Sequence, residues 1–114
     1  MRELKNLEEL KDFIEFYSKC VVIYSSLRCP PCRRLHTVYK HETEVAGLPA
    51  ASVTIDKLSP RDFEKLLNDP KLSLRAVPTI AVYINGEMVF KTVGFNGKDA
   101  LERKIRDFLK KRGA

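Results

Sequence analysis

The stretch CVVIYSSLRCPPCRRL, residues 20–35, decides the fold of this chain. It opens with a short apolar, β-branched run, which predicts a buried strand over residues 20–25. Cys29 follows that strand after a few residues, and only two prolines separate it from Cys32. A cysteine pair at this spacing suits a reactive disulfide, two ligands of a metal ion or a structural staple, so the surrounding elements have to decide between them.

A helix and a second strand follow the cysteine pair. The segment PCRRLHTVYKHETEV, residues 31–45, has proline near its start and Gly47 after its end, which are helix start and stop signals. The segment AASVTID, residues 50–56, predicts a second strand. Two strands joined through a helix pair in parallel with a right-handed crossover. The cysteines therefore lie at the carboxyl end of a strand, where open α/β sheets place their sites.

Three further helices are indicated by apolar residues at helical spacing. The first begins at Asn6, with Glu9 three residues later in a capping-box pattern. The second begins at Ser59 and stops near Asp69. The last, GKDALERKIRDFLKK, residues 97–111, has Lys and Arg crowded into its C-terminal turn, where cations favour the helix dipole.

The segment VPTIAVYINGEMVFKTVG, residues 77–94, predicts a β-hairpin. Two β-rich runs flank Asn85 and Gly86, the residue pair favoured in a type I′ turn. The order of elements is then helix, strand, helix, strand, helix, strand, strand, helix. It predicts an α/β fold with a mixed four-stranded sheet, helices on both faces and an extra N-terminal helix.

Composition points to one domain over residues 1–114, because 44% of the 114 residues are hydrophobic and can form a single core. Three cysteines cannot all pair within one chain, which argues against a disulfide-rich secreted protein. The first residues, MRELKNLEEL, lack the apolar stretch of a signal peptide, and no later run is long enough to span a membrane. We therefore expect a soluble, cytoplasmic protein.

Charge says little about specific partners. The net charge of +6 comes from 21 Lys and Arg against 15 Asp and Glu, spread over the predicted helices. No basic run is interleaved with aromatic residues, so neither nucleic acid nor a membrane is an expected partner. The chain has no Gln, a thermolabile residue, and is rich in Lys, Arg and Glu, which favours a heat-loving source.

The position of the cysteines favours redox chemistry. A helix N-terminus supplies partial positive charge and free N–H groups, and both stabilise a thiolate. Zinc is the alternative, with Cys29, Cys32 and His36 as ligands and His41 or Cys20 as a fourth. A structural zinc site usually has two well-separated ligand pairs, so we expect no metal. Cys20 opens a buried strand and is predicted to pack in the core, whereas both histidines are predicted to be solvated helix residues.

Residues 20–35, together with AVPTIAVYINGEMVFKTVG at 76–94, resemble the thioredoxin superfamily over nearly the whole chain. The resemblance implies a thioredoxin fold in which Cys29 is the nucleophile and Cys32 the resolving thiol. It also implies that the Val77–Pro78 bond is cis, that Pro78 lines the substrate groove and that Val77 offers its backbone to an extended substrate. Pro30 and Pro31 are predicted to line the same groove. Such exchange needs no cofactor. The expected partners are disulfide-containing proteins and a separate thioredoxin reductase. The protein itself is expected to be a monomer.

The chain departs from the thioredoxin pattern near the cysteines. Arg28 stands where thioredoxins usually carry Trp, Pro30 and Pro31 stand between the cysteines in place of Gly-Pro, and Ile23 replaces a buried acid. The strand VVIYSS looks more like that of glutaredoxins, so a glutathione-dependent glutaredoxin-like reductase is the alternative enzyme. A third reading is a non-catalytic, peptide-binding module on the same fold.

We predict that Cys29 has a pKa below the usual value of about 8.5 for a free cysteine. Pro30 and Pro31 have no N–H, which leaves the amide of Cys32 as the obvious donor to a Cys29 thiolate. The charges of Arg28 and Arg33 add stabilisation of the thiolate. Thiol titration of the reduced protein, with Cys29→Ser as the control, measures the pKa, and an unshifted value would contradict the role of Cys29.

Overall fold

The computed structural model describes residues 1–113, which form six strands, four α-helices and one short 3₁₀ helix. In chain order the elements are β1 (Arg2–Glu3), α1 (Leu7–Phe16), β2 (Lys19–Ser25), α2 (Pro30–Val38), β3 (Glu44–Val45), β4 (Leu48–Thr54), η1 (Ile55–Lys57), α3 (Pro60–Leu67), β5 (Thr79–Ile84), β6 (Glu87–Val93) and α4 (Lys98–Arg112). No helix among the described residues is both long enough and apolar enough to cross a bilayer.

The strands form one mixed sheet in the order β1-β4-β2-β5-β6, with β3 paired to β4 alone. β2 runs parallel to β4, and β1 also joins β4 in parallel. β5 runs antiparallel to both β2 and β6. The predicted mixed sheet of four strands is therefore confirmed in β2, β4, β5 and β6, and the two-residue strands β1 and β3 are additions that the sequence pattern did not indicate.

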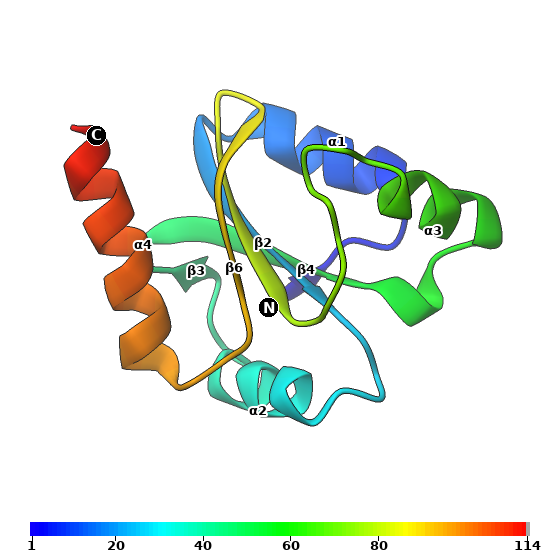
Figure 1. Cartoon of the computed structure of the whole chain (residues 1–114), viewed down its shortest axis with the longest axis horizontal. Helices are drawn as coiled ribbons and strands as arrows, with labels where there is room; N and C mark the ends of the chain where they lie inside the picture. Colours follow the sequence, from blue (N-terminus) through cyan, green and yellow to red (C-terminus); the bar gives the residue numbers. More distant parts are fainter. Residues whose placement is uncertain (114) are drawn as a thin grey trace.

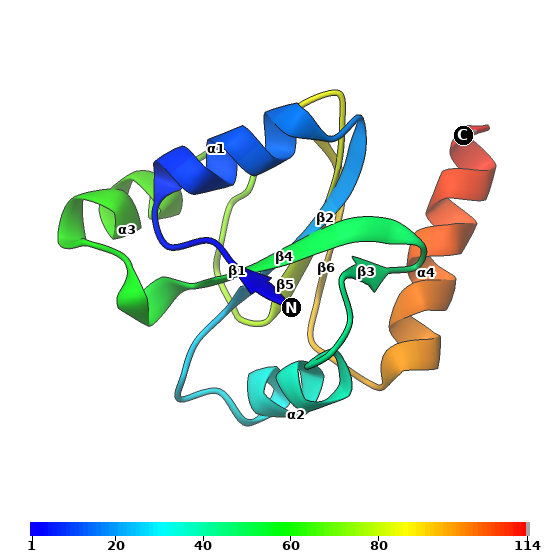
Figure 2. The same cartoon turned by 180° about the vertical axis from the view of Figure 1, so that it is seen from behind.

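Helices cover both faces of the sheet, as predicted (Figures 1 and 2). Because side chains alternate along a strand, each central strand contributes to two cores. Cys20, Val22 and Tyr24 of β2 face α1 and α3, whereas Val21 and Ile23 face α2 and α4. The sheet thus separates two apolar clusters, and the side chain of any β2 residue can be assigned to a face from its number.

Local signals set the helix starts where the sequence predicted them. The Asn6 side chain accepts from the amide of Glu9 at 2.8 Å, and Ser59 Oγ accepts from the amide of Asp62 at 3.1 Å. These N-caps satisfy amide groups that a helix leaves without partners. Asn85 and Gly86 connect β5 to β6 with φ of 51° and 83°, the left-handed pair that a type I′ turn requires.

The helix predicted over residues 31–45 is wrong in its second half, because α2 ends at Val38. Thr43 and Val45 are β-branched and form helix poorly, and the carbonyl of Thr43 instead accepts from the amide of Ala50 at 3.0 Å. Gly47 is therefore the second residue of the turn between β3 and β4 and does not follow a helix. This hairpin also moves the strand predicted at 50–56, which spans Leu48–Thr54.

A buried polar contact ties the end of α2 to α4. Tyr39 is 1% exposed, and its hydroxyl donates to Glu102 at 2.8 Å. Burial, followed by the bond to Glu102, raises the pKa of Tyr39 well above its usual value, so the hydroxyl stays protonated and can donate. Arg106 lies one turn further along α4 and completes the environment of the carboxylate at 3.0 Å.

We predict that Glu102→Ala lowers the free energy of unfolding by about 1–3 kcal/mol, because it leaves the Tyr39 hydroxyl buried without an acceptor. Urea denaturation measures the change. Glu42→Ala is the matched control, since Glu42 pairs with Lys98 at the surface and its loss is expected to cost less than about 1 kcal/mol. Equal losses in the two variants would contradict a structural role for the Tyr39–Glu102 contact.

Candidate redox site

The cysteine pair lies where β2 leads into α2, at the lower edge of the molecule in Figure 1. Cys29 and Cys32 form a disulfide, with their Cα atoms 5.2 Å apart. Cys29 is half-buried and Cys32 is fully buried. A reagent or substrate from solvent therefore reaches the sulfur of Cys29 before that of Cys32.

The sulfur of Cys29 takes the place of an N-cap side chain. Cys29 occupies the N-cap position of α2, and its Sγ accepts from the amide of Cys32 at 3.2 Å. Pro30 and Pro31 fill the first two helical positions and have no N–H. The amide of Cys32 is therefore the first donor that the helix can offer, and it points at the sulfur, as the sequence predicted.

A second loop lies across the sulfur of Cys29. The Val77–Pro78 bond is cis, as the resemblance implied, and the carbonyl oxygen of Val77 lies 3.5 Å from Cys29 Sγ. Thr79 Oγ1 donates to the carbonyl of Ala76 at 2.7 Å, and the amide of Gly94 donates to that of Pro78 at 2.9 Å. These bonds hold Val77 against the sulfur of Cys29, although the two residues are 48 positions apart in the sequence.

Apolar and basic side chains are exposed on the segments next to the cysteines and Pro78. Leu27 is 55% exposed, and Val93, the register partner of Thr79 next to Pro78, is 54% exposed. The sequence analysis did not single out these two residues, and only their places beside the cysteine and proline loops could have indicated them. Arg28 and Arg33 are exposed at the same site, so both can act on it as cations.

Asp56 in η1 holds the loop before the cysteines. Its Oδ2 accepts from Ser26 Oγ at 2.8 Å and from the amide of Leu27 at 3.1 Å. The sequence analysis missed this residue, because the contact joins segments 29 and 30 positions apart and leaves no local pattern. The carboxylate fixes the path along which the chain approaches Cys29.

His36 is not the solvated residue that the sequence predicted. Its ring is half-buried, and its Nε2 is hydrogen-bonded to Oγ of the fully buried Ser25 at 2.9 Å. Burial lowers the pKa of His36, Glu3 raises it, and the amino group of Met1 and Lys57 lower it further. A cavity of about 420 Å³ opens beside the ring and is lined also by Arg33 and Thr37.

The third cysteine takes no part in the site. Cys20 is fully buried and free, and burial raises the pKa of its thiol to about 11. The prediction that it packs in the core is confirmed. Among residues 1–113, no group of three or more His, Cys, Asp or Glu side chains is placed to hold a metal ion.

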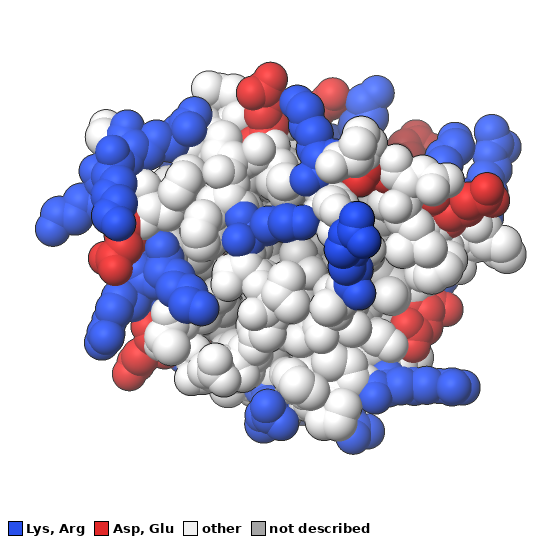
Figure 3. Space-filling model, in the orientation of Figure 1, with Lys and Arg blue, Asp and Glu red and all other residues white. Residues whose placement is uncertain are grey.

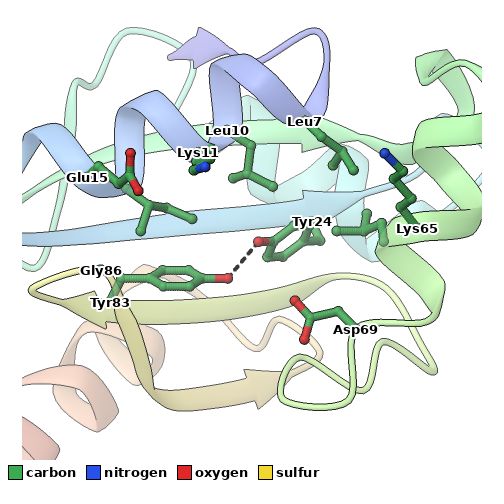
Figure 4. A pocket seen from close by; sticks show the side chains of 11 residues that line it. Leu7, Leu10, Lys11, Glu15, Tyr24, Lys65, Asp69, Tyr83 and Gly86 are labelled. Carbon is green, nitrogen blue, oxygen red and sulfur yellow. Dashed lines mark hydrogen bonds between the residues drawn. The ribbon is translucent and has the colours of Figure 1, made fainter.

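A separate hollow of about 430 Å³ lies between α1 and α3, and none of its lining residues belongs to the cysteine loop (Figure 4). The hydroxyls of Tyr24 and Tyr83 meet at its floor, 2.7 Å apart. Burial is the main cause that raises the pKa of both phenols, that of Tyr83 to about 12. The pair stays neutral and joins β2 to β5 beneath the hollow.

A second group of basic side chains lies away from the cysteines. Figure 3 shows Lys and Arg side chains gathered over α4. The basic residues of that helix are Lys98, Arg103, Lys104, Arg106, Lys110, Lys111 and Arg112. Acidic Asp99, Glu102 and Asp107 lie among them, so the helix is a mixed surface and not a continuous cationic one.

Comparison with known proteins gives a consistent family. A family model described as Thioredoxin matches residues 4–107. A relative named Thioredoxin-3, from Dictyostelium discoideum, is 31% identical over 90 residues, which cover 78% of this chain and 79% of the relative.

Solved structures agree on the fold. Thioredoxin from Plasmodium falciparum has a TM-score of 0.76 at 21% identity, with 95% of this chain and 99% of that chain covered. A mutant thioredoxin from Halobacterium salinarum has a TM-score of 0.74 at 24% identity, with 93% of this chain and 88% of that chain covered.

We predict that Asp56→Ala loosens the loop before Cys29 without unfolding the protein, because the Leu27 amide loses its acceptor. Amide hydrogen exchange followed by NMR should show faster exchange at Leu27. Asp62→Ala is the matched control, since Asp62 accepts from the amide of Leu7 at 3.1 Å on another loop. It should speed exchange at Leu7 and leave Leu27 unchanged, and unchanged exchange at Leu27 in Asp56→Ala would refute the assignment.

Proposed function

We propose that this chain, which belongs to the thioredoxin family and is a protein-disulfide oxidoreductase, reduces disulfides of other proteins through the sequence Cys29-Pro30-Pro31-Cys32. The observation that supports this function best is the arrangement of the two sulfurs. One is accessible and capped by a helix amide, and the other is buried one turn further along the helix. An accessible nucleophile paired with a protected resolving thiol suits two-step exchange.

The reaction begins with the Cys29 thiolate. It attacks one sulfur of a substrate disulfide, forms a mixed disulfide and releases the first substrate thiolate. The Cys32 thiol then loses its proton, and its sulfur attacks Cys29 Sγ, which releases the second substrate thiolate. Two electrons pass to the substrate, and the Cys29–Cys32 disulfide remains.

The surface around Cys29 supports a polypeptide substrate. Leu27, two residues before Cys29, and Val93, the register partner of Thr79 next to Pro78, are exposed apolar side chains that a polypeptide can contact. Val77 is partly exposed and lies outside the sheet, since β5 begins only at Thr79, and its carbonyl reaches Cys29 Sγ. An extended segment could pair with this backbone, as strands do when they add to an exposed edge.

A separate thioredoxin-reductase-type protein is the proposed source of electrons, since the chain itself holds a single reactive pair. The proposed setting is the cytoplasm, where thiols are kept reduced. In that setting the dithiol form is regenerated and the protein acts as a reductant.

The experiment is insulin reduction with dithiothreitol as the electron source, together with trapping of the intermediate. Cys29→Ser should abolish the catalysed reduction, because the nucleophile is lost. Cys32→Ser should accumulate a mixed disulfide with the substrate, visible by mass spectrometry. Cys20→Ser is the matched control, since that thiol is buried and takes no part, and it should keep full activity in the folded variant.

Two results would contradict the proposal. Insulin reduction that persists in Cys29→Ser would show that Cys29 is not the nucleophile. Rapid turnover of glutathione mixed disulfides with little insulin reduction would indicate a glutaredoxin-like enzyme. The direction is measured separately in defined redox buffers. A reduction potential near about −270 mV supports a reductant, and one above about −180 mV would indicate an oxidant or isomerase.

A further inference from the structure

The buried Cys32 thiol needs a proton acceptor when the mixed disulfide is resolved. The thiol must lose a proton before the sulfur can attack Cys29, because the thiolate is the nucleophile. Cys32 is completely buried, which disfavours the charged thiolate. Ile23, on the α2 face of β2, is apolar and cannot accept the proton. Another group has to receive the proton.

His36 is the titratable group that the helix places beside Cys32. Residues four apart in a helix lie on the same face, one turn apart. Long side chains in a helix lean toward its N-terminus, which brings a residue over the preceding turn. His36 is therefore on the face of α2 that carries Cys32, one turn further along the helix.

The hydrogen bond to Ser25 holds the ring in that place. Ser25 is the last residue of β2, and it lies on the same face of the strand as Val21 and Ile23, under α2. The bond of 2.9 Å between Ser25 Oγ and His36 Nε2 therefore fixes the imidazole between the end of β2 and the start of α2. Cys29 is the N-cap of α2, and Cys32 lies in its first turn.

We propose that His36 is the general base that takes the proton from Cys32 when the mixed disulfide is resolved. This inference rests on the proposed thiol–disulfide exchange. Nε2–H donates to Ser25 Oγ, which leaves Nδ1 as the acceptor. The S–H proton of Cys32 passes to Nδ1, directly or through one water. The Cys32 thiolate then attacks Cys29 Sγ, and the substrate leaves as a thiolate.

The surroundings of the ring suit a base that works near neutral pH. The charged groups facing it are Glu3 of β1, Lys57 of η1, the amino group of Met1, and Arg33 on α2. Glu3 and Lys57 pair at 3.3 Å, so their opposite effects on the ring largely offset each other. Burial lowers the pKa of His36, so the imidazole is neutral and able to accept a proton at pH 7.

The cavity beside the ring gives the proton a way out. The imidazolium formed in the reaction lines a cavity of about 420 Å³ shared with Arg33, Thr37 and Lys57. Because burial lowers the pKa of His36, the imidazolium releases its proton readily to water in this cavity. The base is then neutral again before the next turnover, and no residue is consumed.

The test separates the two chemical steps with 5,5′-dithiobis(2-nitrobenzoate). Attack by Cys29 releases one coloured thiolate, and resolution by Cys32 releases the second. At high reagent concentration the second release becomes independent of concentration and reports resolution alone. Its rate is measured by stopped flow from about pH 5 to 8 for the reduced wild-type protein, His36→Gln and the control His41→Gln. His41 is also a histidine, but it is exposed beyond the end of α2.

In the wild type the second release should slow as the pH falls through the pKa of His36, because the protonated ring cannot accept a proton. His36→Gln should slow it at least about a hundredfold at pH 7, the lower end of general-base effects, and should remove that inflection. The first release should be unchanged, and His41→Gln should match the wild type.

Several results would overturn the inference. An unchanged second release in His36→Gln would do so, as would a uniform slowing that keeps the inflection, which indicates a structural role. If His36→Gln does not fold, the pKa of His36 is measured in the wild type by NMR, and an inflection at a different pH excludes the residue. Failure of the first release in the wild type would instead contradict the proposed function itself.

Discussion

The contact on which the site depends is the bond from the Cys32 amide to the sulfur of Cys29. A helix that begins with two prolines has already lost two of the amide donors at its start. The remaining donor determines where the sulfur lies, since the sulfur replaces the oxygen that caps other helices. The position of the nucleophile is thereby tied to the position of α2. The position of α2 depends in turn on the parallel pairing of β2 and β4, which the connecting helix makes possible.

The opposite end of α2 is fixed by a different kind of contact. Tyr39 follows the last residue of α2, is buried in the core and donates to Glu102 of α4. This contact ties the helix that begins at the cysteines to the C-terminal helix. Together with Asp56 on the preceding loop, this contact holds the chain on both sides of the cysteine pair. The site is therefore positioned by polar contacts between distant segments, on a frame set by apolar packing.

The difference between local and distant contacts also explains what the sequence could predict. Asn6, Ser59 and the Asn85-Gly86 turn act on residues next to them, and the structure has each in its predicted role. The segment that follows α2 is harder to predict, because its β-branched residues disfavour a helix only weakly and the burial of Tyr39 depends on Glu102, 63 positions away. The half-buried position of His36 leaves no local pattern either, since its hydrogen-bond partner Ser25 lies on a neighbouring strand. Cys29 and Cys32 could be found because their chemistry and spacing lie in one short stretch.

The burial of Cys20 gives the protein a built-in reporter of its own unfolding. A thiol with no access to solvent and a pKa of about 11 is nearly inert to alkylating reagents while β2 stays paired. While Cys29 and Cys32 are held in their disulfide, Cys20 is the one thiol left to label, and it becomes open to a reagent only when the sheet separates. The rate of Cys20 labelling therefore reports how often β2 separates from its neighbouring strands.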